Sequence, residues 1–244
     1  LALVAMVALS ASAAKKKAPE KNANKPVFTV IKENPITTIK DQNRSGTCWD
    51  YSTLSFFEAE ILKATGKQYT LCEAFVANKT YMERAIQVVR YHGDCQFAQG
   101  GSAEDVLQTL KTYGICPIDA MPFPGSLYGD SLNNFNEFFG VLEPYVAAVA
   151  KSDAKKISSA WKTGMQGILD AYLGKCPEKS TYEGKEYTPK SFYQEYIGTD
   201  LENSYIMVMN DPNHEYYKVY EIDYDRHVYD GENWVYLNLP VDDI

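Results

Sequence analysis

One tight turn constrains the fold of this chain most, because it places a cysteine directly at the start of an apolar helix. Residues 42–49 read QNRSGTCW. Gly46 allows the turn and Thr47 is a suitable N-cap, so the helix is predicted to begin at Cys48. The unpaired N–H groups and the dipole of a helix N-terminus stabilise an anion, so a thiol there ionises more easily than a free one. Cys48 is therefore the candidate catalytic nucleophile.

Gln42 lies six residues before that cysteine and carries a side-chain amide that can donate a hydrogen bond. If the loop folds back, this donor can meet the oxyanion that forms when the Cys48 sulfur attacks a carbonyl. Gln42 is the second candidate catalytic residue.

The helix after Cys48 is predicted to run to about residue 63 and to end at Gly66. Leu54, Phe57 and Ile61 share one face, and Trp49 and Phe56 lie on an adjoining face. Because apolar residues cover more than one stripe, we expect a central, largely buried helix.

Helical and strand periods follow one another along the rest of the chain. Further helices are predicted at residues 73–89, at 103–112 with Ser102 as cap, at 131–151, at 157–174, and from Thr188-Pro189 onward. Strands are predicted at 205–209, 217–222 and 234–239, with turns at 210–213 and 230–231. The order predicts an α+β protein. The Met and aromatic stripe of the helix at 157–174 is interpreted as core packing: Trp161, Met165, Ile168, Leu169 and Tyr172.

The turn resembles a known signature, the Cys-Gly-Ser-Cys-Trp pattern of papain-like cysteine peptidases, and reads SGTCW here. Ser45 replaces the first cysteine of that pattern, so the usual disulfide from this position cannot form. The similarity extends to ITTIKDQ at 36–42, TGK at 65–67, LCE at 71–73 and YGI at 113–115. The long helical block, NDP at 210–212 and YKVY at 217–220 resemble the bleomycin hydrolase and aminopeptidase C branch of the superfamily.

The resemblance implies a papain-like two-lobed fold. A helical lobe would span residues 27–125, a helical insertion 126–203, and the start of a truncated β-rich lobe 204–244. It also implies that Gly100 and Gly101 line a groove and bind the substrate backbone, and it makes Trp49 a further substrate-binding candidate. From the residues alone, a plain turn before a helix is the favoured interpretation of the two glycines.

A catalytic cysteine needs a base oriented by a third group, and in this family these are a His and an Asn far downstream. Only His92, His214 and His227 are present, and none stands about 130 to 150 residues after the cysteine. His227 and Asn233 imitate the pair, but they are six residues apart and are interpreted as structural, while His92 and His214 are expected to be solvated. The pair is expected beyond residue 244, and the chain is expected to be an inactive fragment.

Asp50 departs from the family, which prefers a small residue two places after the nucleophile. Thr47-x-x-Asp50 fits a capping box. A carboxylate close to the Cys48 sulfur would oppose ionisation of the thiol. Asp50→Ala is therefore expected to lower the pKa of Cys48 and to cost some helix stability. Two hypotheses stay open: a secreted thiol peptidase, more an aminopeptidase than an endopeptidase, or a papain-fold binding or scaffold protein without catalysis.

The first residues of the chain bear on its cellular location, and its net charge bears on its ligands. Residues 1–14 form an uncharged apolar run that predicts the remnant of a signal peptide, and residues 15–26 form a basic linker expected to be disordered. Secretion or a periplasmic location is therefore expected. With 24 basic and 32 acidic residues, a net charge of −8, nucleic acid is an unlikely ligand class. No apolar stretch approaches the roughly 18 residues that a membrane-spanning helix needs.

The expected partner is a peptide or protein substrate, and an oligomer is possible. No metal-binding spacing or phosphate loop occurs, so no cofactor is expected. The other cysteines are Cys72, Cys95, Cys116 and Cys176. Export permits disulfides, but no particular pairing is predicted, and buried free thiols are the simpler interpretation.

Overall fold

The computed structural model describes residues 28–121, 132–198, 204–226 and 233–244. The chain divides into two units, residues 1–34 and 35–244. In the first unit, residues 28–34 are described and carry no helix or strand. The predicted signal peptide and basic linker lie outside the described residues.

The helices of the second unit begin close to the predicted residues. They are α1 (Cys48–Thr65), α2 (Glu73–Arg90), α3 (Ala103–Tyr113), the 3-10 helix η1 (Ile118–Ala120), α4 (Asn136–Ala150), α5 (Ala160–Leu173) and α6 (Pro189–Tyr196). The predicted starts at Cys48, after Ser102 and at Thr188-Pro189 are confirmed. The start predicted at residue 131 lies outside the described residues, and α4 is described from residue 136.

Two small sheets complete the second unit. The strands β1 (Ser180–Tyr182) and β2 (Lys185–Tyr187) form an antiparallel hairpin that was not predicted. The three predicted strands are present as β3 (Val208–Met209), β4 (Lys218–Arg226) and β5 (Asn233–Asn238), in the order β3-β5-β4. β3 is parallel to β5, β4 is antiparallel to it, and the 3-10 helix η2 (Val241–Asp243) follows. The predicted turn at 230–231 lies outside the described residues.

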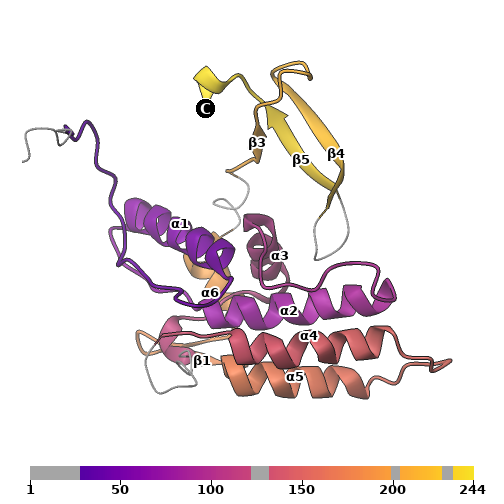
Figure 1. Cartoon of the computed structure of the whole chain (residues 1–244). Coiled ribbons are helices and arrows are strands. Elements are labelled where there is room, and N and C mark those ends of the chain that lie inside the picture. Colours follow the sequence, from indigo (N-terminus) through magenta and orange to yellow (C-terminus); the bar gives the residue numbers. More distant parts are fainter. Residues whose placement is uncertain (1–27, 122–131, 199–203, 227–232) are drawn as a thin grey trace, which may run out of the picture. The chain divides into compact units, whose positions relative to one another are not determined.

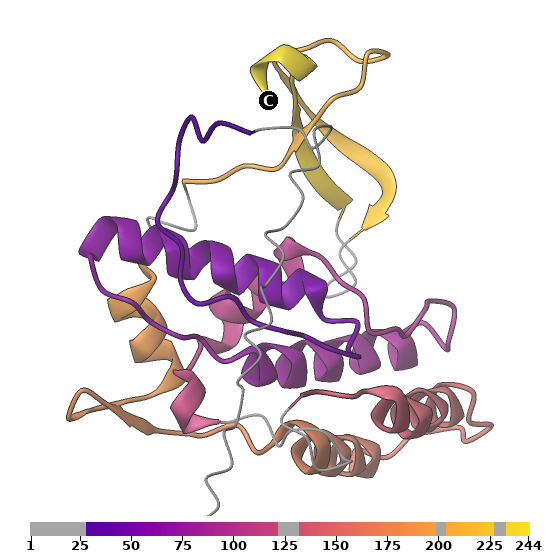
Figure 2. The ribbon, with the colours of Figure 1, turned by 60° about the vertical axis from the view of Figure 1, so that its left-hand side comes forward.

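The most buried helix is α2, which packs against α1, α3, α4 and α5 (Figure 1, Figure 2). The prediction that α1 is largely buried holds in part. Leu54, Phe57 and Ile61 are buried, and so is Trp49 of the adjoining face, but Phe56 on that face is 42% exposed. The helix packs on α2 and α3 and leaves Cys48, Ser52 and Phe56 exposed.

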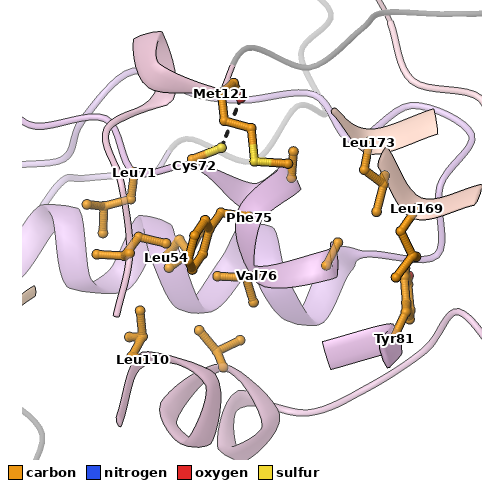
Figure 3. Close-up of a cluster of buried hydrophobic side chains, with 14 of the residues drawn as sticks. Leu54, Leu71, Cys72, Phe75, Val76, Tyr81, Leu110, Met121, Leu169 and Leu173 are labelled. Atoms are coloured by element: carbon orange, nitrogen blue, oxygen red, sulfur yellow. Dashed lines mark hydrogen bonds between the residues drawn. The ribbon is translucent and has the colours of Figure 1, made fainter. Parts of the chain in front are cut away.

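The core gathers apolar side chains from all six described α-helices. Figure 3 shows Leu54 of α1, Phe75 and Tyr81 of α2, Leu110 of α3 and Leu169 of α5, all buried. The α5 stripe is confirmed as core, because Met165 and Leu169 are buried and the remaining members pack against the cluster. No described helix is long and apolar enough to cross a membrane.

All five cysteines are free thiols. Cys72 and Cys116 are buried, as the simpler interpretation expected, while Cys95 and Cys176 are partly exposed. The Cys72 thiol donates to the carbonyl oxygen of Met121 at 3.1 Å, the dashed line in Figure 3.

Candidate active site

The loop before α1 is closed by a reciprocal pair of hydrogen bonds. Gln42 Nε2 donates to the Ser45 carbonyl at 2.6 Å, and Ser45 Oγ donates to the Gln42 carbonyl at 2.8 Å. Asn43 takes a left-handed backbone conformation with φ of 49°, which asparagine tolerates better than most residues. Ser45, at the position of the resembled family's first cysteine, thus closes the loop without a covalent bond.

Cys48 is the first residue of α1 and its side chain is exposed. The N–H groups of Asp50 and Tyr51 both donate to the Thr47 carbonyl at 3.0 Å, which fixes the first turn. The Cys48 N–H lies in that turn, where no intrahelical acceptor exists. It is therefore placed to stabilise negative charge beside the thiol.

The structure brings Cys48 and Gln42 together in one pocket of about 400 Å³. The segment 36–40 forms one wall, because it runs back along α1 (Figure 2). Gln42 gives one amide hydrogen to the loop, and a side-chain amide has two. One donor of Gln42 is left for a ligand in this pocket.

A second wall of the pocket is formed by α1 itself, through Tyr51, Ser52 and Ser55. These residues were not predicted, although they follow Cys48 at i+3, i+4 and i+7, the spacing of one helix face. Burial raises the pKa of Tyr51 well above its usual value, and its oxygen accepts a hydrogen bond from Asn133 Nδ2 at 2.9 Å. Tyr51 is therefore a neutral phenol in the pocket wall.

The segment 97–101 carries the predicted substrate-binding glycines, which are both exposed. A Cβ on Gly101 would lie 2.2 Å from Arg84 Nη2 and 2.8 Å from Trp49 Cδ2, so no side chain fits there. Gly100 faces open space. Close packing against Arg84 and Trp49 thus explains why position 101 needs a glycine, and no ligand is required for this explanation. The substrate contacts of Gly100 and Gly101 stay predictions.

Trp49 lies in the core with 4% of its surface exposed. Its Nε1 donates to the Gln99 carbonyl at 2.9 Å, and the Arg84 guanidinium lies 5.0 Å from the ring centre. The indole donor is thus used inside the protein. A substrate-binding role for Trp49 stays a prediction.

A buried cluster joins the segment before the loop to two helices. Lys40 Nζ lies 2.5 Å from both Glu58 Oε1 of α1 and Glu73 Oε1 of α2. Glu58 also accepts from the Leu71 N–H at 2.7 Å and from Thr37 Oγ1 at 3.0 Å. Sequence analysis missed this cluster, because Lys40 lies 18 and 33 positions from its two partners and no local pattern contains them.

Comparisons with known proteins also indicate similarity to peptidases. Residues 172–244 match the model of the Peptidase C1-like family. The chain is 26% identical to aminopeptidase G of Lactobacillus delbrueckii subsp. lactis over 246 residues, covering 86% of this chain and 55% of that protein. It is 24% identical to aminopeptidase C of Lactococcus lactis subsp. cremoris over 253 residues, covering 90% of this chain and 57% of that protein.

The chain is thus similar to aminopeptidases C and G and, over residues 172–244, to the Peptidase C1-like family. It has the fold of the crystal structure of PepW from Lactobacillus rhamnosis, with a TM-score of 0.63, 23% identity, and coverage of 90% of this chain and 56% of that one. The predicted papain-like α+β fold is confirmed. The chain spans a little over half the length of the relatives it matches.

In the part of the chain that the structure describes, no histidine lines the Cys48 pocket. His92 and His214 are exposed, as predicted for polar turns, and His214 Nδ1 lies 2.7 Å from Asp211 Oδ2. His227 lies outside the described residues. Asn233 donates to Glu221 Oε1 at 2.8 Å, a contact within the sheet.

Asp50 does not form the predicted capping box with Thr47, because Thr47 makes no side-chain cap and both Asp50 oxygens are buried without a hydrogen-bond partner. Burial, and after it the nearby Glu73, raise the pKa of Asp50 well above its usual value. The charged form of Asp50 is therefore disfavoured, which weakens the expected opposition to Cys48 ionisation. The effect of Asp50→Ala on Cys48 stays a prediction.

No group of three or more His, Cys, Asp or Glu among the described residues is arranged to hold a metal ion.

Proposed function

We propose that this chain carries the nucleophile side of a cysteine aminopeptidase. The observation that supports it most strongly is the exposed Cys48 thiol at the first residue of α1, in one pocket with Gln42. The names of its relatives, aminopeptidases C and G, support the same reaction class. Export, inferred from the apolar run at residues 1–14, is part of the proposal.

In the proposed reaction the Cys48 thiolate attacks the carbonyl carbon of the first peptide bond. The new S–C bond turns the carbonyl oxygen into an oxyanion, which the Cys48 N–H and the free Gln42 amide hydrogen stabilise. The C–N bond then breaks, the amine leaves with a proton from the general base, and water hydrolyses the thioester. The base is a histidine still to be assigned.

The segment 36–42 gains a role in this scheme. Because Lys40 holds it to Glu58 and Glu73, Gln42 is presented from a fixed backbone. A preorganised donor stabilises a transition state better than one that must be ordered during the reaction. The cluster of Lys40, Glu58 and Glu73 therefore helps to hold the Gln42 donor in position.

The test uses full-length protein and an aminoacyl arylamide substrate. Gln42→Ala is expected to lower kcat on the order of 10²- to 10³-fold, the cost of losing one oxyanion donor. Gln68→Ala is the matched control, because Gln68 is exposed and donates only to Thr38 Oγ1 at 3.1 Å. An unchanged kcat in Gln42→Ala contradicts the oxyanion role, and full activity of Cys48→Ala contradicts the proposed function.

The exopeptidase character has its own control. The same substrate with an acetylated amino group is expected to be cleaved far more slowly, because an aminopeptidase recognises the free amine. Equal rates on both substrates would favour an endopeptidase.

A further inference from the structure

All three carbonyls of residues 98–100 face into the protein. Arg84 Nη1 donates to the carbonyls of Ala98, at 3.1 Å, and Gly100. The Gln99 carbonyl between them accepts from Trp49 Nε1 at 2.9 Å and from Tyr81 OH at 3.1 Å. The backbone on both sides of Gln99 is thus fixed by buried donors.

Arg84 is itself held in place. It is 1% exposed and its Nη2 lies 2.9 Å from Asp105 Oδ2 at the start of α3. A buried, paired guanidinium has a planar, preorganised fork of donors. The segment 98–100 therefore rests on a rigid support and not on a surface side chain.

The Gln99 side chain points toward the nucleophile turn. Its Oε1 accepts from the Gly46 N–H at 2.7 Å. A Cβ on Gly46 would lie 2.7 Å from Gln99 Cβ, so the two backbones approach as closely as a glycine permits. Gly46 precedes Thr47, whose carbonyl anchors the first turn of α1. One side chain thus joins the glycine segment to the turn that carries Cys48.

We propose that Gln99 is a positioning residue for the Cys48 nucleophile, acting through the Gly46 N–H. This inference rests on the proposed function. Ser45 leaves no cysteine at the disulfide position of the turn, and the Gln99 hydrogen bond links the turn to residues 98–100 without a covalent bond. Arg84 and Trp49 hold the glycine segment, so loss of the Gln99 side chain displaces the nucleophile more than the substrate.

The experiment compares Gln99→Met, which keeps the side-chain length and removes the acceptor, with Gln99→Glu, which keeps an acceptor. Gln96→Met is the matched control, because Gln96 is exposed on the same segment. Three readouts are taken on full-length protein: kcat and KM on an aminoacyl arylamide, the rate of Cys48 alkylation by iodoacetamide followed by peptide mass spectrometry, and hydrogen exchange of the Gly46 amide.

Gln99→Met is expected to lower kcat and the alkylation rate about 3- to 10-fold, the size of one neutral hydrogen bond, with KM within about twofold. The Gly46 amide loses its protection in this variant. Gln99→Glu keeps the protection and recovers at least part of kcat. A carboxylate near a thiolate can only slow the reaction, so recovery by Gln99→Glu isolates the hydrogen bond.

The inference is overturned if Gln99→Met matches Gln96→Met in kcat and alkylation, or if the Gly46 amide stays protected in Gln99→Met. It is also overturned if KM rises while kcat stays constant, since the residue would then act on substrate binding alone. If the wild type hydrolyses no peptide, the proposed function fails, whereas alkylation and hydrogen exchange still decide the role of Gln99.

Discussion

The helices α1 and α3 begin with the same motif and use it differently. Thr47-x-x-Asp50 precedes and enters α1, and Ser102-x-x-Asp105 precedes and enters α3. Both aspartates are buried, with 0% and 2% of their surface exposed. In α3 the Ser102 side chain accepts from the Asp105 N–H, and Asp105 Oδ2 accepts from the Ser102 N–H at 2.9 Å, which completes a capping box. In α1 neither bond forms.

The backbone of the cap residue explains part of the difference. Ser102 is extended, with φ −132° and ψ 169°, the conformation that an N-cap side chain needs. Thr47 has φ −105° and ψ 25°, and its hydroxyl lies 2.6 Å from Ser45 Oγ. The Thr47 side chain is thus engaged in closing the nucleophile loop.

The charged neighbours explain the rest. Asp105 faces the guanidinium of Arg84, while Asp50 has the carboxylate of Glu73 as its strongest charged neighbour. A neighbouring cation favours the charged form of a buried carboxyl, and a neighbouring carboxylate disfavours it. The same sequence motif therefore gives a carboxyl paired with a guanidinium at one helix start and a carboxyl with a raised pKa at the other.

Asp105→Asn should have the largest effect, because it leaves the buried Arg84 charge without its partner. We expect the free energy of unfolding to fall by about 3 to 5 kcal/mol. Urea unfolding at pH 7 measures it. The double variant Asp105→Leu with Arg84→Met should recover part of this loss, since both charges are removed. A loss below about 1 kcal/mol in Asp105→Asn would show that the pair is not what distinguishes α3.

Asp50→Asn should have the opposite effect on the free energy of unfolding. It should raise the free energy of unfolding at pH 7 by about 1 to 3 kcal/mol, because the amide folds without the proton that the raised pKa makes Asp50 take up. The folded-state pKa of Asp50 lies above the unfolded value of about 3.9, so its favourable contribution is complete below that pH and is lost as pH rises. The gain in Asp50→Asn should therefore disappear near pH 4.

The check is urea unfolding of wild type and Asp50→Asn across pH 4 to 7. A variant that is less stable than wild type at pH 7 would mean that Asp50 is an anion with a partner. A gain of equal size at both ends of the range would show that the proton is not the cause.

Ser102→Ala should have the smallest effect, a loss of about 1 kcal/mol for one N-cap. Ser159→Ala is the matched control, because Ser159 occupies the N-cap position of α5, is exposed, and makes no side-chain cap. The control should change stability by less than about 0.5 kcal/mol. Equal losses in the two variants would contradict the difference in capping.

Local sequence signals predicted the elements well. The turn at Gly46, the cap at Ser102 and the Thr188-Pro189 start depend on neighbouring residues alone, and all three are confirmed. The β1–β2 hairpin was missed because its strands have three residues each, too few for a period. Its turn residues Glu183 and Gly184, with φ of 47° and 80°, were the available signal.

The site was predictable only in part. Cys48 and Gln42 could be identified because the signature turn holds both of them. The contacts of Lys40 and Gln99 join residues 18 to 53 positions apart and the environment of Asp50 depends on burial, so no local pattern contains them. Tertiary packing decided which buried carboxyl pairs with a cation and which has a raised pKa.

Covalent labelling of Cys48 tests the central claim most directly. Full-length protein is treated with an aminoacyl chloromethyl ketone, a substrate-like electrophile with a free amino group, and the adduct is located by peptide mass spectrometry. We expect one adduct on the Cys48 sulfur, suppressed by a competing dipeptide and absent from Cys48→Ala. Labelling of the partly exposed Cys95 or Cys176 instead, or no substrate-protected adduct, would contradict Cys48 as the nucleophile.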